Sequence, residues 1–188
     1  MDDLRKQHEA IDRVNRQYGS RFRMVKGIEA NILADGALDM AAEELEALEF
    51  VVAAPHAALR LLTDQTDRML AVVTNRRVNV LGHARGRQFG TRPGIKADWP
   101  RVFKAAAKRS VAIEIDGDPS RQDVDSTLAR VALDAGCVLA LSSDAHSAAE
   151  LRYLENAMAH ARLAGAPRDR VINTWPLDRL LKWAVRRK

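Results

Sequence analysis

Short apolar runs alternate with amphipathic stretches along the chain, and each kind of stretch predicts one kind of element. Apolar residues recur at helical spacing over residues 4–17, 41–48, 64–74, 99–109, 124–135, 148–163 and 177–187. Runs of strand length lie at residues 24–33, 50–56, 78–83, 111–116 and 138–144. Strands that alternate with helices at this period pair in parallel. We therefore expect a single α/β domain spanning residues 1–188, with the sheet either open and doubly wound or closed into a barrel.

Ionisable side chains gather where these predicted strands end. Glu29 lies in the first strand, His56 and His83 end the next two, Glu114 and Asp116 lie on the fourth, and Asp144 and His146 follow the fifth. The carboxyl ends of parallel strands share one rim, which binds ligands in barrels and in open sheets, so we expect these residues to meet there. Imidazole nitrogen and carboxylate oxygen are ligands for Zn, Mn and Fe. The pattern therefore indicates a metal site and metal-assisted hydrolysis.

A basic loop follows the third predicted strand. Arg85 and Arg87 come shortly after His83, and a guanidinium there could hold a phosphate with its planar pair of donors. A loop of solvated basic residues is the alternative. The glycines of residues 82–90 do not open a helix in the way that a phosphate-binding loop requires, so a nucleotide site is not favoured.

Composition narrows the class of protein further. The chain has 188 residues, of which 47% are apolar, and this suffices for one core. The single cysteine, Cys137, excludes an internal disulfide and a cysteine cluster as a metal site, and is typical of a reducing compartment. No stretch approaches the ~18 uninterrupted apolar residues of a membrane span, and the first residues lack the apolar stretch of a signal peptide. We expect a soluble, cytoplasmic protein without a membrane partner.

The charge balance is mildly basic. Lys and Arg number 30 against 25 Asp and Glu, which gives a net charge of +5 and a modest preference for anionic partners. Part of this excess comes from Arg186, Arg187 and Lys188 at the end of the chain. The sequence contains no recognisable helix-turn-helix, zinc finger or aromatic stacking platform, so it does not favour base-specific recognition of nucleic acid.

Six segments, taken together and in order, resemble one known family. They are residues 27–36 (GIEANILADG), 50–56 (FVVAAPH), 81–87 (LGHARGR), 113–116 (IEID), 142–147 (SSDAHS) and 171–174 (VINT). They resemble the PHP (polymerase and histidinol phosphatase) domain, most closely the one at the C-terminus of bacterial family X DNA polymerases. The resemblance implies a distorted seven-stranded, TIM-like (β/α) barrel that carries up to three metal ions, usually Zn or Mn, on its rim and hydrolyses phosphoesters. In the polymerases such a domain supplies 3'-5' exonuclease and 3'-end phosphatase activity, which implies DNA 3' ends as substrates and a part in DNA repair.

The resemblance also implies roles for particular residues. The implied metal ligands are Glu29, bridging two metals, His56 and His83, completing one of those sites, Asp144, on the bridged partner metal, and His146, on the third. Asp144 is also implied in catalysis. Arg87 is the arginine of a Gly-His-x-x-Gly-Arg pattern and resembles a catalytic residue that contacts phosphate.

Features that the family carries before Glu29 are missing. The family begins with a strand bearing a His-x-His motif, then a further histidine and a second strand that ends in Asp-His, and nothing before Glu29 matches these. The resemblance therefore implies an incomplete barrel of about five parallel strands with flanking helices, without the first two β/α units. Only the site of Glu29, His56 and His83 keeps all its protein ligands, so we expect a depleted centre with one to three metals. Smaller departures are Ala54-Pro55 for Ser-Val, Asn31 for Asp and Asp116 for Asn.

An incomplete barrel exposes a strand edge and an apolar face, which is unfavourable in water. We expect one of three remedies: the helix at residues 4–17 packs into the opening, two chains associate across it, or the natural gene product is longer than this chain. A homodimer that covers the open edge is the most economical of the three.

The pattern and the resemblance together predict a metal-dependent phosphoesterase whose metal centre is truncated or degenerate. Two alternatives stay open. One is a non-catalytic scaffold of the same fold that binds DNA or a partner protein through a basic surface. The other is a small-molecule phosphatase of the histidinol-phosphate type. Residue types do not distinguish Zn from Mn or Fe, because His and carboxylate suit all three.

Overall fold

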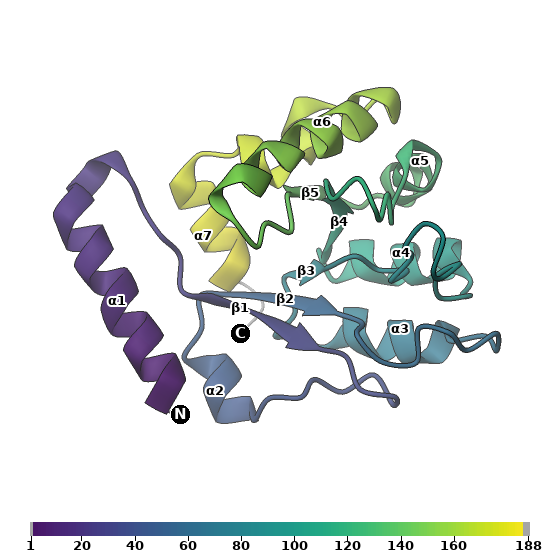
Figure 1. Cartoon of the computed structure of the whole chain (residues 1–188), viewed down its shortest axis with the longest axis horizontal. Coiled ribbons are helices and arrows are strands. Elements are labelled where there is room, and N and C mark those ends of the chain that lie inside the picture. Colours follow the sequence, from purple (N-terminus) through teal and green to yellow (C-terminus); the bar gives the residue numbers. More distant parts are fainter. Residues whose placement is uncertain (1, 186–188) are drawn as a thin grey trace.

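Five parallel strands form the centre of the fold. In this computed structural model, residues 2–185 are described. The strands are β1 (Gly27–Asn31), β2 (Phe50–Ala54), β3 (Val80–Leu81), β4 (Ala112–Asp116) and β5 (Leu139–Ser142). They pair in parallel in the order β1-β2-β3-β4-β5 (Figure 1). The all-parallel sheet confirms the predicted α/β class, and the sequential strand order differs from a doubly wound sheet, in which the order reverses.

Helices precede, connect and follow these strands. They are α1 (Asp2–Tyr18), α2 (Ala42–Glu46), α3 (Thr66–Thr74), α4 (Trp99–Lys108), α5 (Ser126–Asp134), α6 (Leu154–Leu163) and α7 (Leu177–Val185), with short 3-10 helices at Gly19–Arg21, Ala148–Tyr153, Arg168–Arg170 and Ile172–Thr174. The carboxylates of Asp98 and Asp125 cap α4 and α5 by accepting a backbone N–H in the first turn. Each predicted helix is present within the described residues, although the first part of the one predicted at 148–163 is a 3-10 helix. The last two residues of the helix predicted at 177–187 lie outside the described residues.

Arg186, Arg187 and Lys188, which contribute to the basic excess, lie outside the described residues. Within residues 2–185, no helix combines the length and the apolar character that crossing a bilayer requires.

The two faces of the sheet have different partners. Residues such as Val51, Ile113 and Ile115 belong to the main core together with apolar residues of α3, α4, α5 and α6. Alternate strand residues point to the opposite face, here called the inner face. There Val80, Ala112 and Ala140 pack with Ile172 and with the aromatic rings of Trp175 and Trp183 near α7. Farther toward the carboxyl ends, the inner face carries Glu114, Asp116 and Ser142. The inner face is therefore apolar at its base and polar at its carboxyl rim.

The sheet ends at β1 and β5, which pair with no further strand among residues 2–185. The side chain of Asn173 covers part of the β5 edge, because it accepts the N–H of Leu141 and donates to the carbonyl of Leu141, both at 2.8 Å. At the β1 edge, Asp39 accepts the N–H of Asn31 at 2.8 Å. Five strands in sequential order are compatible with part of a TIM-like barrel, and the sheet is not closed within the described residues.

The first helix lies at the amino-terminal end of β1. Figure 1 shows α1 crossing that end of the sheet, on the side away from the carboxyl rim. Lys26, just before β1, pairs with Asp12 of α1 at 2.8 Å, and Asn15 bonds to the backbone of Met24. The structure therefore does not support the prediction that this helix fills the opening beside β1, because these contacts hold α1 at the end of the strand and not along its edge.

Candidate metal centre

Three ligand atoms meet at the carboxyl rim of the sheet. Glu29 projects from β1, and His56 and His83 lie two residues beyond β2 and β3. Oε1 of Glu29 lies 3.1 Å from Nε2 of His56 and 3.3 Å from Nε2 of His83. One ligand atom from each residue lies within 4.8 Å of the other two, and no other His, Cys, Asp or Glu group within residues 2–185 meets this criterion. The structure thus brings together three of the five predicted metal ligands.

These separations fit a divalent metal. Bonds of about 2.0–2.2 Å in tetrahedral geometry place neighbouring ligand atoms about 3.3–3.6 Å apart. The two distances from Glu29 are within about 0.2 Å of that range. The side chains of His56 and Glu29 are 45% and 40% exposed, so one side of the site is open to solvent. A site with three protein ligands and an open position is typical of catalytic zinc.

Polar groups around the triad orient its ligands. Oδ1 of Asn31 accepts the backbone N–H of His56 at 3.2 Å and lies 3.3 Å from its Nδ1, which leaves Nε2 directed toward Glu29. On the other side, Oε2 of Glu114 accepts the backbone N–H of His83 at 2.5 Å. A Cβ on Gly82 would lie 2.6 Å from Cγ1 of Val52. Glycine at position 82 therefore allows the chain before His83 to lie close against the inner face.

A buried arginine holds the ends of β1 and β2 together beneath the triad. Arg68 of α3 donates to the carbonyls of Ile32, Leu33 and Ala57 at 2.6–3.1 Å. Its side chain also donates to Gln65 at 2.7 Å. Because one guanidinium joins the segment after Glu29 to the residue after His56, Arg68 fixes their separation. In the sequence, Arg68 is only one position of a predicted helix. Its role in joining the segments after β1 and β2 was therefore not predicted.

The ionisation of the three ligands is coupled. The hydrogen bond from His83 lowers the pKa of Glu29, in spite of partial burial. Burial lowers the pKa of His83, but its bond to Glu29 and the charge of Glu114 outweigh burial, and the pKa is raised overall. Burial and the neighbouring charge of His83 lower the pKa of His56. The protein therefore favours a positive charge between Glu29 and His83, which is the place that a bound cation would take.

A second cluster of charges lies farther along the rim. Arg121, in the loop after β4, places Nη2 2.9 Å from Oδ2 of Asp144 and Nε 3.3 Å from Oδ2 of Asp116. Nε also lies 3.7 Å from Asp118. Asp144 was predicted as a metal ligand, and the structure pairs its carboxylate with this guanidinium. Sequence reasoning missed Arg121, whose only signal was a lone cation in the acidic loop at residues 116–123.

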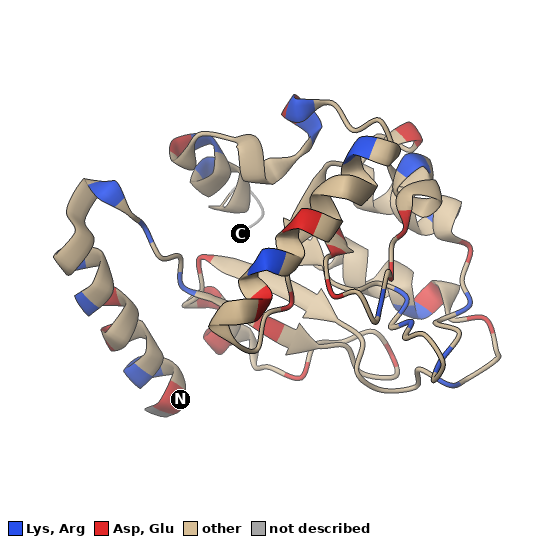
Figure 2. Ribbon diagram, turned by 45° about the horizontal axis from the view of Figure 1, so that its top comes forward, with Lys and Arg blue, Asp and Glu red and all other residues tan. Residues whose placement is uncertain are grey.

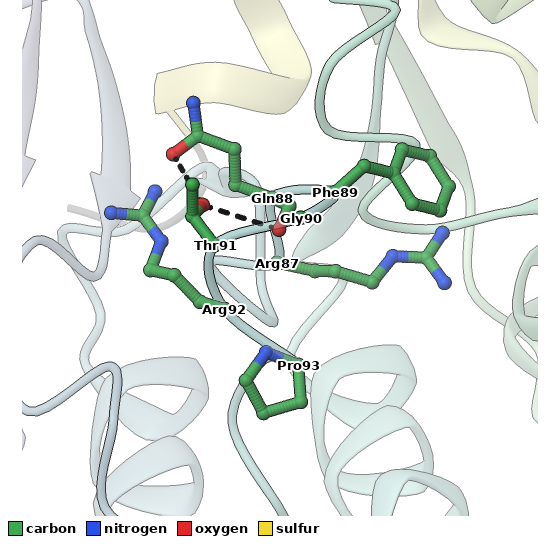
Figure 3. A pocket seen from close by; sticks show the side chains of 7 residues that line it. All are labelled: Arg87, Gln88, Phe89, Gly90, Thr91, Arg92 and Pro93. Carbon is green, nitrogen blue, oxygen red and sulfur yellow. Dashed lines mark hydrogen bonds between the residues drawn. The ribbon is translucent and has the colours of Figure 1, made fainter.

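The remaining predicted residues lie at the edges of the rim. His146 is exposed, and its Nδ1 lies 2.8 Å from the carbonyl of Asp144. Nε of Arg87 donates to the carbonyl of Arg121 at 3.3 Å, and its guanidinium lies 5.0 Å from the ring centre of Phe89. Figure 3 shows Arg87 and Phe89 extending together from a loop that lines a pocket of about 350 Å³. In this arrangement Arg87 supports the loop of Arg121.

The buried carboxyl of Asp116 makes stability depend on pH. Burial raises its pKa to about 7, from an ordinary 3.8. Between pH 3.8 and about pH 7, the folded protein holds a proton on Asp116 that the unfolded chain has released. The stability that this proton contributes is therefore present at pH 4 and is lost as the pH rises through about 7. Between pH 5 and pH 8, we expect the free energy of unfolding of wild type to fall by about 2–4 kcal/mol relative to that of Asp116→Asn, because the amide cannot ionise.

Urea unfolding of both proteins at several pH values, in chelator so that no metal contributes, measures this difference. Asp3→Asn is the matched control, since the side chain of Asp3 is fully exposed, and its difference from wild type should stay constant with pH. A constant difference for Asp116→Asn as well would contradict the prediction.

The sequence of this chain is similar to those of probable phosphatases and of a DNA polymerase. No family model matches the chain. A probable phosphatase of Yersinia pestis (strain Pestoides F) is 30% identical over 174 residues, which cover 87% of this chain and 68% of that protein. The probable phosphatase YcdX of Escherichia coli (strain K12 / DH10B) is 29% identical over 163 residues, covering 81% of this chain and 64% of YcdX. The DNA polymerase/3'-5' exonuclease PolX of Bacillus subtilis (strain 168) is 29% identical over 171 residues, covering 90% of this chain and 30% of PolX. The chain thus spans about two thirds of these phosphatases and under a third of the polymerase.

Proposed function

This chain belongs to the family of the Yersinia pestis probable phosphatase, and from that premise we propose that it is a metal-dependent phosphoesterase of the PHP type. The names of its relatives support a phosphoesterase-like function in general. The observation that carries the proposal is the meeting of Glu29, His56 and His83 at metal-ligand separations on the rim of a parallel sheet. Such rims bind substrates in α/β folds.

The triad and the residues around it would have separate roles in binding the metal and the substrate. Glu29, His56 and His83 would hold one divalent metal, Zn or Mn, through one carboxylate oxygen and two Nε2 atoms. When bound, the metal lowers the pKa of a water molecule and neutralises phosphate charge. The exposed side of His56 and Glu29 leaves room for a phosphate ester, and Asn31 and Glu114 keep the two histidines oriented. We propose that Asp144 and Arg87 act on the substrate side of the site through their contacts with Arg121, and that His146 is a candidate ligand of a further metal.

The proposed substrates and the proposed assembly of the chain follow from the resemblance to the polymerase domain. The proposed substrates are phosphate esters: monoesters, as for the probable phosphatase, and the 3' ends of DNA, as for the 3'-5' exonuclease PolX. The five strands would be part of a distorted barrel whose open edge a second copy of the chain covers. Figure 2 shows Lys and Arg interspersed with Asp and Glu along the described ribbon. A basic scaffold that binds DNA stays the alternative.

Metal content together with hydrolysis tests this function. We expect protein purified without chelator, or incubated with Zn²⁺ or Mn²⁺, to hold metal measurable by inductively coupled plasma mass spectrometry. The loaded protein should release phosphate from a 3'-phosphorylated oligonucleotide, and faster than from histidinol phosphate. A preference for histidinol phosphate would favour a small-molecule phosphatase. Protein that binds neither metal would contradict the proposal and favour a non-catalytic scaffold.

A further inference from the structure

The side chain of Arg121 is enclosed by carboxylates from three segments. Asp116 ends β4, Asp118 belongs to the following loop, and Asp144 follows β5. Their oxygens lie 3.3 Å, 3.7 Å and 2.9 Å from the guanidinium. The side chain of Asp116 is fully buried, and those of Arg121 and Asp144 are 17% and 15% exposed. A guanidinium thus neutralises an acidic cluster that a cation would otherwise be needed to neutralise.

The Arg121 cluster and the metal triad share one rim. Glu114 and Asp116 are alternate residues of β4 and both point to the inner face. Glu114 bonds to the backbone of His83, and Asp116 contacts Arg121. The carboxylates of Glu114 and Asp116 therefore lie between the metal triad and the guanidinium of Arg121.

The backbone around Arg121 is held in an unusual conformation. Gln122, its neighbour in the chain, has φ 39°, and Asp144, its closest partner, has φ 48°. Residues with side chains seldom adopt such left-handed conformations, which persist where the surrounding structure enforces them and which cluster at functional sites. Arg87 adds a bond to the carbonyl of Arg121. Several independent contacts therefore fix the position of this guanidinium.

Only some of the N–H groups of the Arg121 guanidinium face a carboxylate. Nε and Nη2 face the aspartates, and none of the hydrogen bonds or ion pairs of Arg121 found within residues 2–185 is made through Nη1. A planar guanidinium with a free pair of N–H groups matches the oxygens of a phosphate. Positive groups that are fixed in advance stabilise the charge that develops in phosphoryl transfer.

We infer that Arg121 provides the second positive charge of this centre, in place of a second metal ion, and binds a phosphoryl oxygen of the substrate through Nη1. This inference rests on the proposed function, because it assigns the phosphate contact of the same site. It makes Arg121 a catalytic residue, and it makes Asp116 and Asp144 positioning residues that hold the guanidinium.

Two substitutions and one control test the inference. Arg121→Ala removes the charge and the donors, and Arg121→Lys keeps the charge without the planar fork and guards against a loss of folding. Arg101→Ala is the control, because Arg101 is 61% exposed on α4 and pairs only loosely with Asp67 at 3.8 Å. Each protein is examined by circular dichroism, metal content, binding of inorganic phosphate by calorimetry, and kcat/KM on a 3'-phosphorylated oligonucleotide.

We expect Arg121→Ala to keep the metal of the triad while kcat/KM falls about 100-fold or more, with a smaller loss in Arg121→Lys. Phosphate affinity should fall about tenfold or more, and millimolar guanidinium ion should restore part of the activity of Arg121→Ala. Arg101→Ala should match wild type in all measurements. Full activity and phosphate affinity in Arg121→Ala would overturn the inference, as would loss of the triad metal in that variant.

Failure of the proposed function gives a different result. If metal-loaded wild type hydrolyses no phosphate ester, the proposed function fails, but phosphate binding still tests Arg121. Phosphate affinity that depends on Arg121 supports its role as the anion contact, and phosphate affinity that is equal in wild type and Arg121→Ala overturns it.

Discussion

Replacing His83 with alanine is expected to lower metal affinity about 100-fold or more and to remove hydrolysis, while the fold is kept. Nε2 of His83 lies 3.3 Å from Oε1 of Glu29, and the ring is almost fully buried. No other described His, Cys, Asp or Glu reaches this group of ligand atoms, so a site with three protein ligands becomes one with two. The backbone N–H of residue 83 can still donate to Glu114, which preserves the chain path.

Metal titration followed by mass spectrometry, with circular dichroism as the folding control, measures the effect of His83→Ala. Glu29→Gln should lose metal in the same way, since the amide has the same shape without the charge, and it replaces His83→Ala if that protein does not fold. His160→Ala is the matched control, because His160 lies on α6 and does not belong to the group of ligand atoms. Metal content equal to wild type in both His83→Ala and Glu29→Gln would overturn the assignment of the triad as the metal site.

Replacing Gly117 with alanine is expected to destabilise the protein by about 3 kcal/mol. A Cβ at position 117 would lie 2.1 Å from the carbonyl oxygen of Tyr153 and 2.8 Å from that of Ser142. Both are backbone atoms, which cannot turn away as a side chain can. The N–H of Gly117 also donates to Ser142 at 2.9 Å, and its carbonyl accepts from Asn156 at 2.9 Å. The added methyl group must therefore separate the end of β4 from its neighbours.

Urea unfolding of Gly117→Ala measures this loss in the free energy of unfolding. Gly19→Ala is the control, because a Cβ there meets nothing within 4 Å although the residue has φ +56°, and it should cost about 1–2 kcal/mol from backbone conformation alone. Destabilisation by Gly117→Ala no larger than that of Gly19→Ala would contradict the close packing. Because Arg121 lies on the loop that Gly117 begins, we also expect weaker phosphate binding in the folded fraction.

The predicted elements agree closely with the structure, because apolar spacing is a local property. The strand predicted at 111–116 is β4 at Ala112–Asp116, and the helix predicted at 64–74 is α3 at Thr66–Thr74. The strand predicted at 78–83 shortens to two residues in β3, since the segment after it turns toward the rim, where His83 is held by Glu114. Pairing partners, which apolar spacing does not specify, set the ends of each strand.

The position of charged side chains depended on tertiary contacts. Arg87 was predicted to contact phosphate, and it lies beside Phe89 with its Nε bonded to Arg121. The phosphate contact of Arg87 stays a prediction. Arg121, which the sequence analysis did not single out, contacts carboxylates at the ends of two different strands. A long flexible side chain can reach many places, and the choice among them depends on partners distant in the sequence.

The sequence by itself determined the α/β class, the order of the elements and the meeting of Glu29, His56 and His83, because the carboxyl ends of parallel strands must share one rim. Only the tertiary structure decided two further features: the place of α1 at the amino-terminal end of β1, and the pairing of Asp144 with Arg121. These depend on packing and on charge pairs between segments far apart in the chain, and periodicity carries no information about such contacts.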